Sequence, residues 1–187
     1  RKVVVNVDIE GFFPNTRFKR VRRAVERVLP RSLSPEARRL VVDICSMDGG
    51  LPIGAPTSPA IANLVMLPVD RALAKVAARH GVAYTRYADD LTLSGDDPAR
   101  LLPFLREVVG KLGYRLDPKK TNFFRRGRRQ VVTGLVVNDK VSVPRKLRRR
   151  LRAAVHRVAT QGDAAELTWH GRPMDAGELA GKRRRRR

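Results

Sequence analysis

The order of the predicted elements indicates an α+β fold with a mainly antiparallel sheet. A buried, β-branched strand over residues 2–9 is followed by helices, then by a hairpin of two short strands, another helix and further strands. Strands and helices do not alternate strictly, which is typical of α+β domains. A chain of 187 residues is long enough for one domain with its own core.

Local signals place each helix in the first half of the chain. Apolar residues at helical spacing predict a helix over residues 16–29, and the N-cap Ser34, followed by proline, predicts the start of a second one. A loop rich in glycine and proline over residues 47–56 precedes a long helix from Ser58 to His80. Pro68 lies inside that helix, so we expect a kink there.

The second half begins with strands over 82–87 and 91–94, joined by a tip that contains Asp89 and Asp90. The further predicted elements are a helix from about 98 to 111, strands over 114–116, 130–137 and 141–143, and an arginine-rich helix from 144 to about 160. Beyond residue 161 the pattern predicts no regular structure, and the run Lys182–Arg187 is expected to be a disordered basic tail.

The strongest compositional signal is charge. The chain has 40 Lys and Arg against 18 Asp and Glu, a net charge of +22, and without the terminal run Lys182–Arg187 the net charge is still +16. Such an excess favours a polyanionic partner, because neutralised phosphates release counterions. An anionic membrane is the weaker alternative, since residues 145–160 lack a continuous apolar face with aromatic anchors.

Several classes of protein are excluded. No stretch approaches the roughly 20 apolar residues of a membrane-spanning helix, so we expect no membrane partner. The single cysteine, Cys45, cannot form an internal disulfide, and three widely separated histidines offer no zinc cage. These features and the absence of a signal peptide predict a cytoplasmic, zinc-free protein. The chain starts within a predicted strand, so we expect its natural N-terminal part to be missing.

Two acidic elements suggest chemistry: Asp8, at the end of the first strand, and the pair Asp89 and Asp90 at the hairpin tip. Adjacent aspartates are common in turns for conformational reasons alone. A basic, nucleic-acid-binding protein, however, gains nothing by aiming carboxylates at phosphates unless divalent cations lie between them. The three acids therefore predict a site for two Mg²⁺ ions, which would activate a 3′-hydroxyl and stabilise a leaving pyrophosphate.

Five segments, in order and at compatible spacing, resemble motifs of reverse transcriptases. Val7–Pro14 resembles motif A, and Tyr84–Leu91, with its Tyr-x-Asp-Asp pattern, resembles motif C. The others are Gly50–Pro59 with Asn63 and Asp70 (motif B), Leu116–Thr121 (motif D), and Val132–Asn138, which is similar to the segment at the motif E position of retron and related bacterial enzymes. Ile53 departs from the pattern, because many reverse transcriptases have glutamine there.

The resemblance implies a ferredoxin-like palm, an antiparallel sheet packed on helices, over residues 1–143. Residues 144–181 would begin a helical thumb, and 182–187 would form the tail. The fingers domain, expected upstream of Asp8, is not in the chain.

The resemblance also implies roles for individual residues. The catalytic residues would be Asp8, Asp89, Asp90 and Lys120, and the metal would be bound by Asp8, Ile9, Asp89 and Asp90. The nucleotide would be bound by Phe13, Gly54, Ala55 and Tyr87. Primer and template would be bound by Gly134, Leu135, Arg145, Arg148, Arg149 and Arg152. Alternatives stay open for several of these residues. Gly54 is either a nucleotide contact or a lead into the following helix, Tyr87 is either a nucleotide contact or a half-buried strand residue, and Gly134 and Leu135 form either a primer grip or an ordinary β-hairpin. Lys119 rivals Lys120 as the motif D lysine, Phe13 is either a steric gate against ribose or a core aromatic, and the arginines are either phosphate contacts or a solvated face.

The implied activity is that of a retron-like RNA-directed DNA polymerase. It would add dNTPs to a primer 3′-hydroxyl with two Mg²⁺, or Mn²⁺ as a substitute, and would copy a structured non-coding RNA from an RNA or DNA primer. A role in antiphage defence with an accessory effector protein would follow. The alternatives are a group II intron or other defence-associated reverse transcriptase, and a non-catalytic RNA-binding module; the missing fingers raise the question whether this fragment alone is active.

Overall fold

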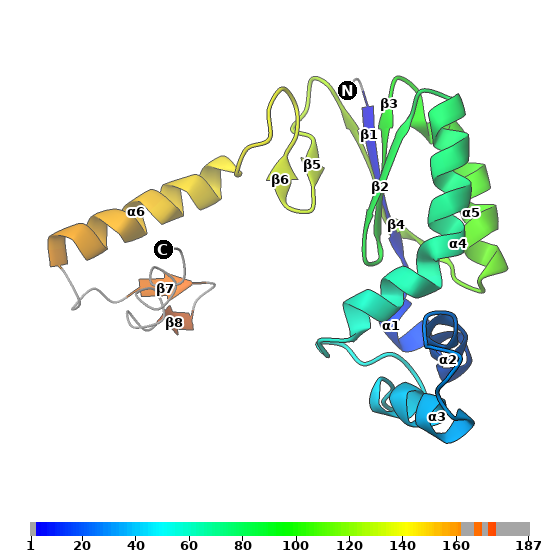
Figure 1. Cartoon of the computed structure of the whole chain (residues 1–187). Coiled ribbons are helices and arrows are strands. Elements are labelled where there is room, and N and C mark those ends of the chain that lie inside the picture. Colours follow the sequence, from blue (N-terminus) through cyan, green and yellow to red (C-terminus); the bar gives the residue numbers. More distant parts are fainter. Residues whose placement is uncertain (1–2, 162–166, 170–171, 175–187) are drawn as a thin grey trace. The chain divides into compact units, whose positions relative to one another are not determined.

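The computed structural model describes residues 3–161, 167–169 and 172–174. The chain forms two compact units. The first comprises Arg1–Thr133 and Val137–Asp139, and the second comprises Gly134–Val136 and Lys140–Arg187. The candidate acids all lie in the first unit, which is built around one sheet (Figure 1).

The sheet of the first unit has four antiparallel strands in the order β2-β3-β1-β4. The strands are β1 (Val3–Ile9), β2 (Ala83–Tyr87), β3 (Asp90–Gly95) and β4 (Leu116–Arg125). A long helical connection joins β1 to the β2–β3 hairpin, and a second one joins the hairpin to β4. This order and connectivity are those of the ferredoxin-like fold, which confirms the predicted fold class.

The helices of this unit are α1 (Phe12–Asn15), α2 (Phe18–Glu26), α3 (Pro35–Ile44), α4 (Ser58–Arg79), the 3₁₀ turn η1 (Pro98–Leu101) and α5 (Leu102–Lys111). Figure 1 shows α4 and α5 along one face of the sheet and α1, α2 and α3 grouped near its lower end. The core between the two layers contains Val5, Val7 and Ile9 of β1, Leu91 and Leu93 of β3, Met66 and Leu73 of α4, and Leu105 of α5. Pro68 lies within α4, and the helix axis bends along its length in Figure 1.

The other face of the sheet carries polar side chains, because side chains alternate along a strand. Asn6 and Asp8 alternate with the core residues of β1. The amide of Asn6 donates a hydrogen bond to the carbonyl oxygen of Val131 at 2.8 Å and accepts one from Thr92 Oγ1 at 3.2 Å. Asp8 therefore lies at the end of a polar row on the face that the helices leave uncovered.

The structure departs from the sequence-based expectations at several elements. In place of the short strand expected over 114–116, the structure has the ten-residue strand β4, which includes the polar motif D segment. The strand expected over 130–137 is interrupted at Thr133 and Gly134, whose φ angles are 46° and 81°, and only β5 (Val131–Val132) and β6 (Leu135–Val136) remain. The strand expected over 141–143 is reduced to one bridge between Val136 and Ser142.

The second unit contains α6 (Arg145–Gln161) and an antiparallel pair, β7 (Leu167–Trp169) and β8 (Arg172–Met174). The arginine-rich helix was predicted, but the expectation of no regular structure beyond 161 is wrong for these two strands. The tail at 182–187 lies outside the described residues. In the described part of the chain, no helix is both long and apolar enough to cross a lipid bilayer.

Candidate active site

The sheet brings the three predicted acids together. In the register of β1 and β3, Asp8 lies directly opposite Asp90. The turn between β2 and β3 is held to β1, because the backbone N–H of Ile9 donates to the carbonyl oxygen of Asp89 at 3.1 Å. All three side chains are half-buried. Residues that are about 80 positions apart in the chain thus share one end of the polar face.

The electrostatics of this end favour a bound cation. Partial burial raises the pKa of Asp90, and the negative charges of Asp8 and Asp89 raise it further. A carboxylate surrounded in this way gains from a positive charge nearby. Its neighbours on the sheet therefore create a site that attracts cations.

Lys120 supplies one such charge. Its ammonium lies 2.9 Å from Asp8 Oδ1, an ion pair that joins β4 to β1. The hydrogen bond and the charge of Asp8 raise the pKa of Lys120, which stays exposed to solvent. Lys119, the rival motif D lysine, instead uses its backbone N–H to bind Asp117 Oδ1 at 2.8 Å. Of the two lysines, Lys120 is the one in contact with a candidate catalytic acid.

The donors at this end suit a hard divalent ion. Aspartate oxygens and a backbone carbonyl such as that of Ile9 are the ligand types that Mg²⁺ prefers. Among the described residues, no group of three or more His, Cys, Asp or Glu side chains is arranged to hold a metal ion, and Lys120 engages one oxygen of Asp8. The chemistry of the residues thus fits the predicted metal, while a complete ligand cage is not formed.

An ion pair beneath the hairpin fixes the turn that carries Asp89 and Asp90. Arg86, whose side chain is 6% exposed, binds Asp70 of α4 with two hydrogen bonds, Nε to Oδ1 at 2.8 Å and Nη2 to Oδ2 at 2.6 Å. Tyr84 donates its hydroxyl to the same carboxylate at 2.7 Å. Burial alone would lower the pKa of Arg86, but the hydrogen bonds and charge of Asp70 outweigh it and raise that pKa.

The same guanidinium also reaches the hairpin tip. Arg86 Nη1 donates to the carbonyl oxygen of Ala88 at 2.9 Å and to Asn63 Oδ1 at 3.2 Å. Ala88 has a φ of 52°, a left-handed conformation that residues other than glycine rarely adopt. The bond from Arg86 holds this strained residue directly before Asp89, so the helix α4 positions the acids through one side chain.

This support was not predicted from the sequence: Asp70 and Arg86 lie in segments that resemble motifs B and C, but neither residue was assigned a role of its own. A signal was present in the spacing. Asn63 and Asp70 are seven residues apart, so they lie two turns apart on one face of a helix. Tyr84 and Arg86 are two residues apart in a strand, so their side chains point to the same face of the sheet.

The predicted nucleotide-binding residues lie on loops and on α1. Gly54 has a φ of 86° and open space around it, and the neighbouring Ile53 is 79% exposed. Ala55 is half-buried, and the loop is anchored where Ser58 Oγ donates to the carbonyl oxygen of Pro52 at 2.5 Å. This leaves the backbone of the motif B loop accessible to a ligand.

Phe12 and Phe13 follow the acid strand on α1. Phe12 is buried in the core, whereas Phe13 is half-buried and packs edge-on against it with 5.4 Å between ring centroids. Tyr87, the other aromatic predicted at the nucleotide, is 72% exposed at the end of β2. Both side chains are accessible to a ligand.

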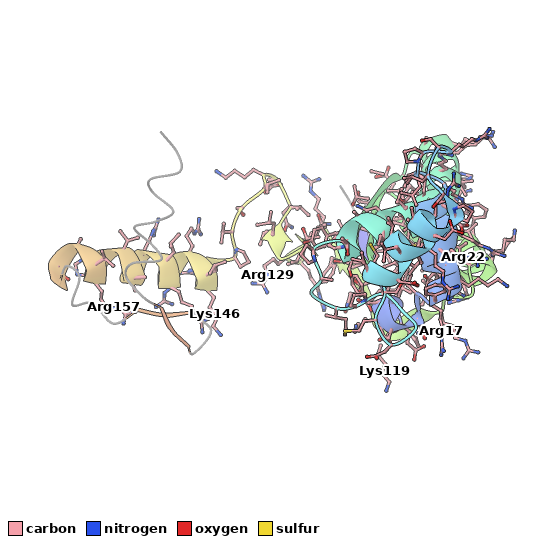
Figure 2. The ribbon with its side chains drawn as sticks, turned by 60° about the horizontal axis from the view of Figure 1, so that its bottom comes forward. Arg17, Arg22, Lys119, Arg129, Lys146 and Arg157 are labelled. Atoms are coloured by element: carbon pink, nitrogen blue, oxygen red, sulfur yellow. The ribbon has the colours of Figure 1, made fainter. Side chains whose placement is uncertain are left out.

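The predicted primer and template residues belong to the second unit. Gly134 has a φ of 81°, and Leu135 is 39% exposed. Arg145, Arg148, Arg149 and Arg152 all lie exposed on α6. Figure 2 shows Lys146 and Arg157 extending from the same helix, which contains no acidic residue. On the apolar side of α6, Leu151 and Val155 are also exposed, 54% and 61% respectively.

Comparisons with known proteins agree with the geometry of the site. Residues 1–143 match the family model described as "Reverse transcriptase (RNA-dependent DNA polymerase)". The chain is 39% identical to the Retron Mx65 reverse transcriptase and 40% identical to the Retron Mx162 reverse transcriptase, both of Myxococcus xanthus. These matches cover 87% and 82% of the chain, but only 42% and 39% of the two relatives.

A more distant protein has the same fold. The structure of apo telomerase from Candida tropicalis, truncated from the C-terminal domain, matches with a TM-score of 0.54 over 76% of the chain and 35% of that protein. The sequence identity is 12%, so this match bears on the fold alone. The family match over 143 residues carries the assignment, and the chain belongs to the reverse transcriptase family.

Proposed function

We propose that the protein containing this chain is an RNA-directed DNA polymerase. The observation that carries the proposal is the cross-strand pair Asp8 and Asp90, with Asp89 beside them, on the face of the sheet that the helices leave open. Carboxylates of this kind hold the metal ions of nucleotidyl transfer. The retention of all three acids favours an enzyme over a non-catalytic RNA-binding module.

Each residue would have a distinct part in the reaction. Asp8, Asp89, Asp90 and the carbonyl of Ile9 would hold two Mg²⁺, which when bound lower the pKa of the primer 3′-hydroxyl and neutralise the leaving pyrophosphate. Lys120 would move from Asp8 to the phosphates and donate a proton to the pyrophosphate, because its ammonium is already at the site. The loop at Gly54 and Ala55 would contact the nucleotide through its backbone.

The direct test is primer extension by the full-length protein. We expect dNTP incorporation on an RNA template with a DNA primer in the presence of Mg²⁺, and none with EDTA. Incorporation that persists without divalent ions would contradict the proposed role of the acids. The match to two retron reverse transcriptases supports a retron-type function. A structured RNA as template and a cytoplasmic location are part of this proposal.

Phe13 provides a test of nucleotide selection. If the ring lies against the sugar of the incoming nucleotide, Phe13→Val removes the obstacle to a 2′-hydroxyl. We expect the preference for dNTP over rNTP, measured as the ratio of kcat/KM values, to fall by about tenfold, or ~1.4 kcal/mol. An unchanged ratio in a folded, active variant would mean that Phe13 is a core aromatic only.

The arginines of α6 provide a test of strand binding. If Arg148, Arg149 and Arg152 contact phosphates, replacing all three by glutamine reduces the slope of log K against log salt for single-stranded RNA by about two units. The affinity should weaken alike for every RNA sequence, because phosphate contacts do not read bases. A slope equal to that of the parent would identify these arginines as a solvated face.

A further inference from the structure

The helical side of the palm has a basic groove whose charges the proposed reaction does not use. It has a volume of about 490 Å³ and lies between α2, the middle of α4 and the end of α5. None of its lining residues is acidic, and six are cationic. They are Arg17, Lys19, Arg20, Arg23, Arg27 and Lys111, together with Ala24, Val65, Pro68, Gly110, Leu112 and Gly113.

Arg20 is held in place within this groove by neutral groups. Its Nη1 donates to the carbonyl oxygen of Asn15 at 2.7 Å, and its guanidinium carbon lies 4.8 Å from the ring centroid of Tyr114. Tyr114 is itself fixed by a 2.7 Å hydrogen bond with buried Thr16. A Cβ atom at Gly113 would collide with Arg20 Nη2, so glycine leaves room for the guanidinium. None of these contacts neutralises the charge.

The acids near the groove do not balance its charge. Glu26, the one acidic residue of α2, lies 3.7 Å from Arg22, which is not a lining residue. Glu107 pairs with Lys111 at 2.6 Å, which neutralises one of the six cations. Like charges so close together repel one another, which costs stability unless an anion binds between them.

The dimensions suit a nucleic-acid backbone. Arg20, Arg23 and Arg27 are three and four residues apart, on one side of a helix, and Figure 2 marks Arg17 at the start of the same segment. At 1.5 Å per residue the row from Arg20 to Arg27 is about 10 Å long. Successive phosphates of one strand of double-stranded DNA advance by about 3.4 Å along the helix axis, so a double helix of similar rise would place about three phosphates along the row.

The position separates this groove from the reacting end of the primer. The groove lies between α2, α4 and α5, and buried residues of these helices belong to the same core as Val7 and Ile9 of β1. Asp8 points to the opposite face of the sheet, because it alternates with those two residues along β1. A strand held in the groove therefore lies on the other side of the sheet from the candidate catalytic acids.

We propose that the groove binds the phosphate backbone of a double-helical RNA segment that is not being copied. The proposal rests on the proposed polymerase function, since it assigns a second contact to the same RNA. Binding would depend on the shape and charge of the helix and not on its sequence, as is usual for contacts to phosphates.

The test compares two triple variants of the full-length protein with the same change in charge. Arg17→Gln, Arg23→Gln and Arg27→Gln alter the groove, whereas Lys75→Gln, Arg79→Gln and Arg106→Gln alter exposed cations of α4 and α5 that do not line it. Binding of an RNA hairpin with about 20 base pairs is measured against salt concentration. We expect the groove variant to lose two to three units of slope, at about 0.9 per phosphate contact, and the control to keep the slope of the parent.

Primer extension on a short primer–template separates this proposal from the polymerase function. The groove variant should extend it at the rate of the parent, because the groove lies on the other side of the sheet. Equal losses of slope in both triple variants would overturn the groove as a site, as would a groove variant that also loses extension. A parent protein that binds the hairpin but extends no primer would instead contradict the polymerase function alone.

Discussion

Replacement of Asp89 by asparagine is expected to abolish Mg²⁺-dependent dNTP incorporation while RNA binding survives. The substitution removes one carboxylate charge but keeps the hydrogen bond from the Ile9 N–H, which uses the backbone of Asp89. The fold of the hairpin should therefore persist. We expect the extension rate to fall at least a thousandfold, or ~4 kcal/mol of transition-state stabilisation. Single-turnover primer extension and RNA binding, measured on the same preparation, check both halves of the expectation.

The matched control is Asp97→Asn, a similar loss of charge two residues beyond the end of β3. Asp97 is exposed, and its side chain makes no capping hydrogen bond. This variant should extend primers at the rate of the parent. A parallel loss of RNA binding and activity in the Asp89 variant would indicate that Asp89 is structural.

Replacement of Arg86 by methionine should have the largest effect on stability. The change leaves the carboxylate of Asp70, whose side chain is 27% exposed, without its cation. Breaking a fully buried pair in this way costs about 3–5 kcal/mol, and the partial exposure of Asp70 reduces the expected loss to about 2–3 kcal/mol. Since Ala88 also loses its anchor, the rate of primer extension should fall as well. Urea unfolding gives the first quantity and single-turnover extension the second.

The exposed ion pair of Arg39 and Asp43 offers a control for Arg86. Its atoms are 3.8 Å apart, with side chains 81% and 49% exposed. Arg39→Met should therefore cost less than about 1 kcal/mol and leave extension unchanged. If the two variants lost the same stability, the ion pair below the hairpin would have no special role.

The sequence was sufficient to predict the fold class and the grouping of the acids. The apolar strand with Asp8 at its end and the hairpin with Asp89 and Asp90 at its tip both have a short-range signal, namely β-branched alternation and turn residues. Pairing these two strands then brings the acids together, as the register of β1 with β3 shows. The local sequence pattern was enough, because each acid lies at the end of a strand or in a turn that can be recognised from its own residues.

Long-range contacts gave no comparable signal. The segment 116–125 contains few apolar residues, so its pairing with the central strand was not predictable from periodicity, yet it forms the ten-residue strand β4. The ion pair between Arg86 and Asp70 likewise depends on how α4 lies against the hairpin, which no local pattern encodes. The strand break at Thr133 and Gly134 depends on positive φ angles at these two residues. The β-branched residues around them predicted a continuous strand instead.

The place of β1 in the sheet has a consequence for synthesis of the protein on the ribosome. The strand that carries Asp8 precedes both of its neighbours in the chain, and its partner Lys120 follows 112 residues later. At roughly 5–20 residues per second, that interval lasts roughly 6–22 s. Until β3 is synthesised, this valine-rich strand has no partner on either edge, and the edge that pairs with β4 stays open for the whole interval. An unpaired edge is the condition that favours aggregation or capture by chaperones. The candidate active site is thus among the last parts of the palm to form, because the pairing of β4 with β1 both completes the sheet and brings Lys120 to Asp8.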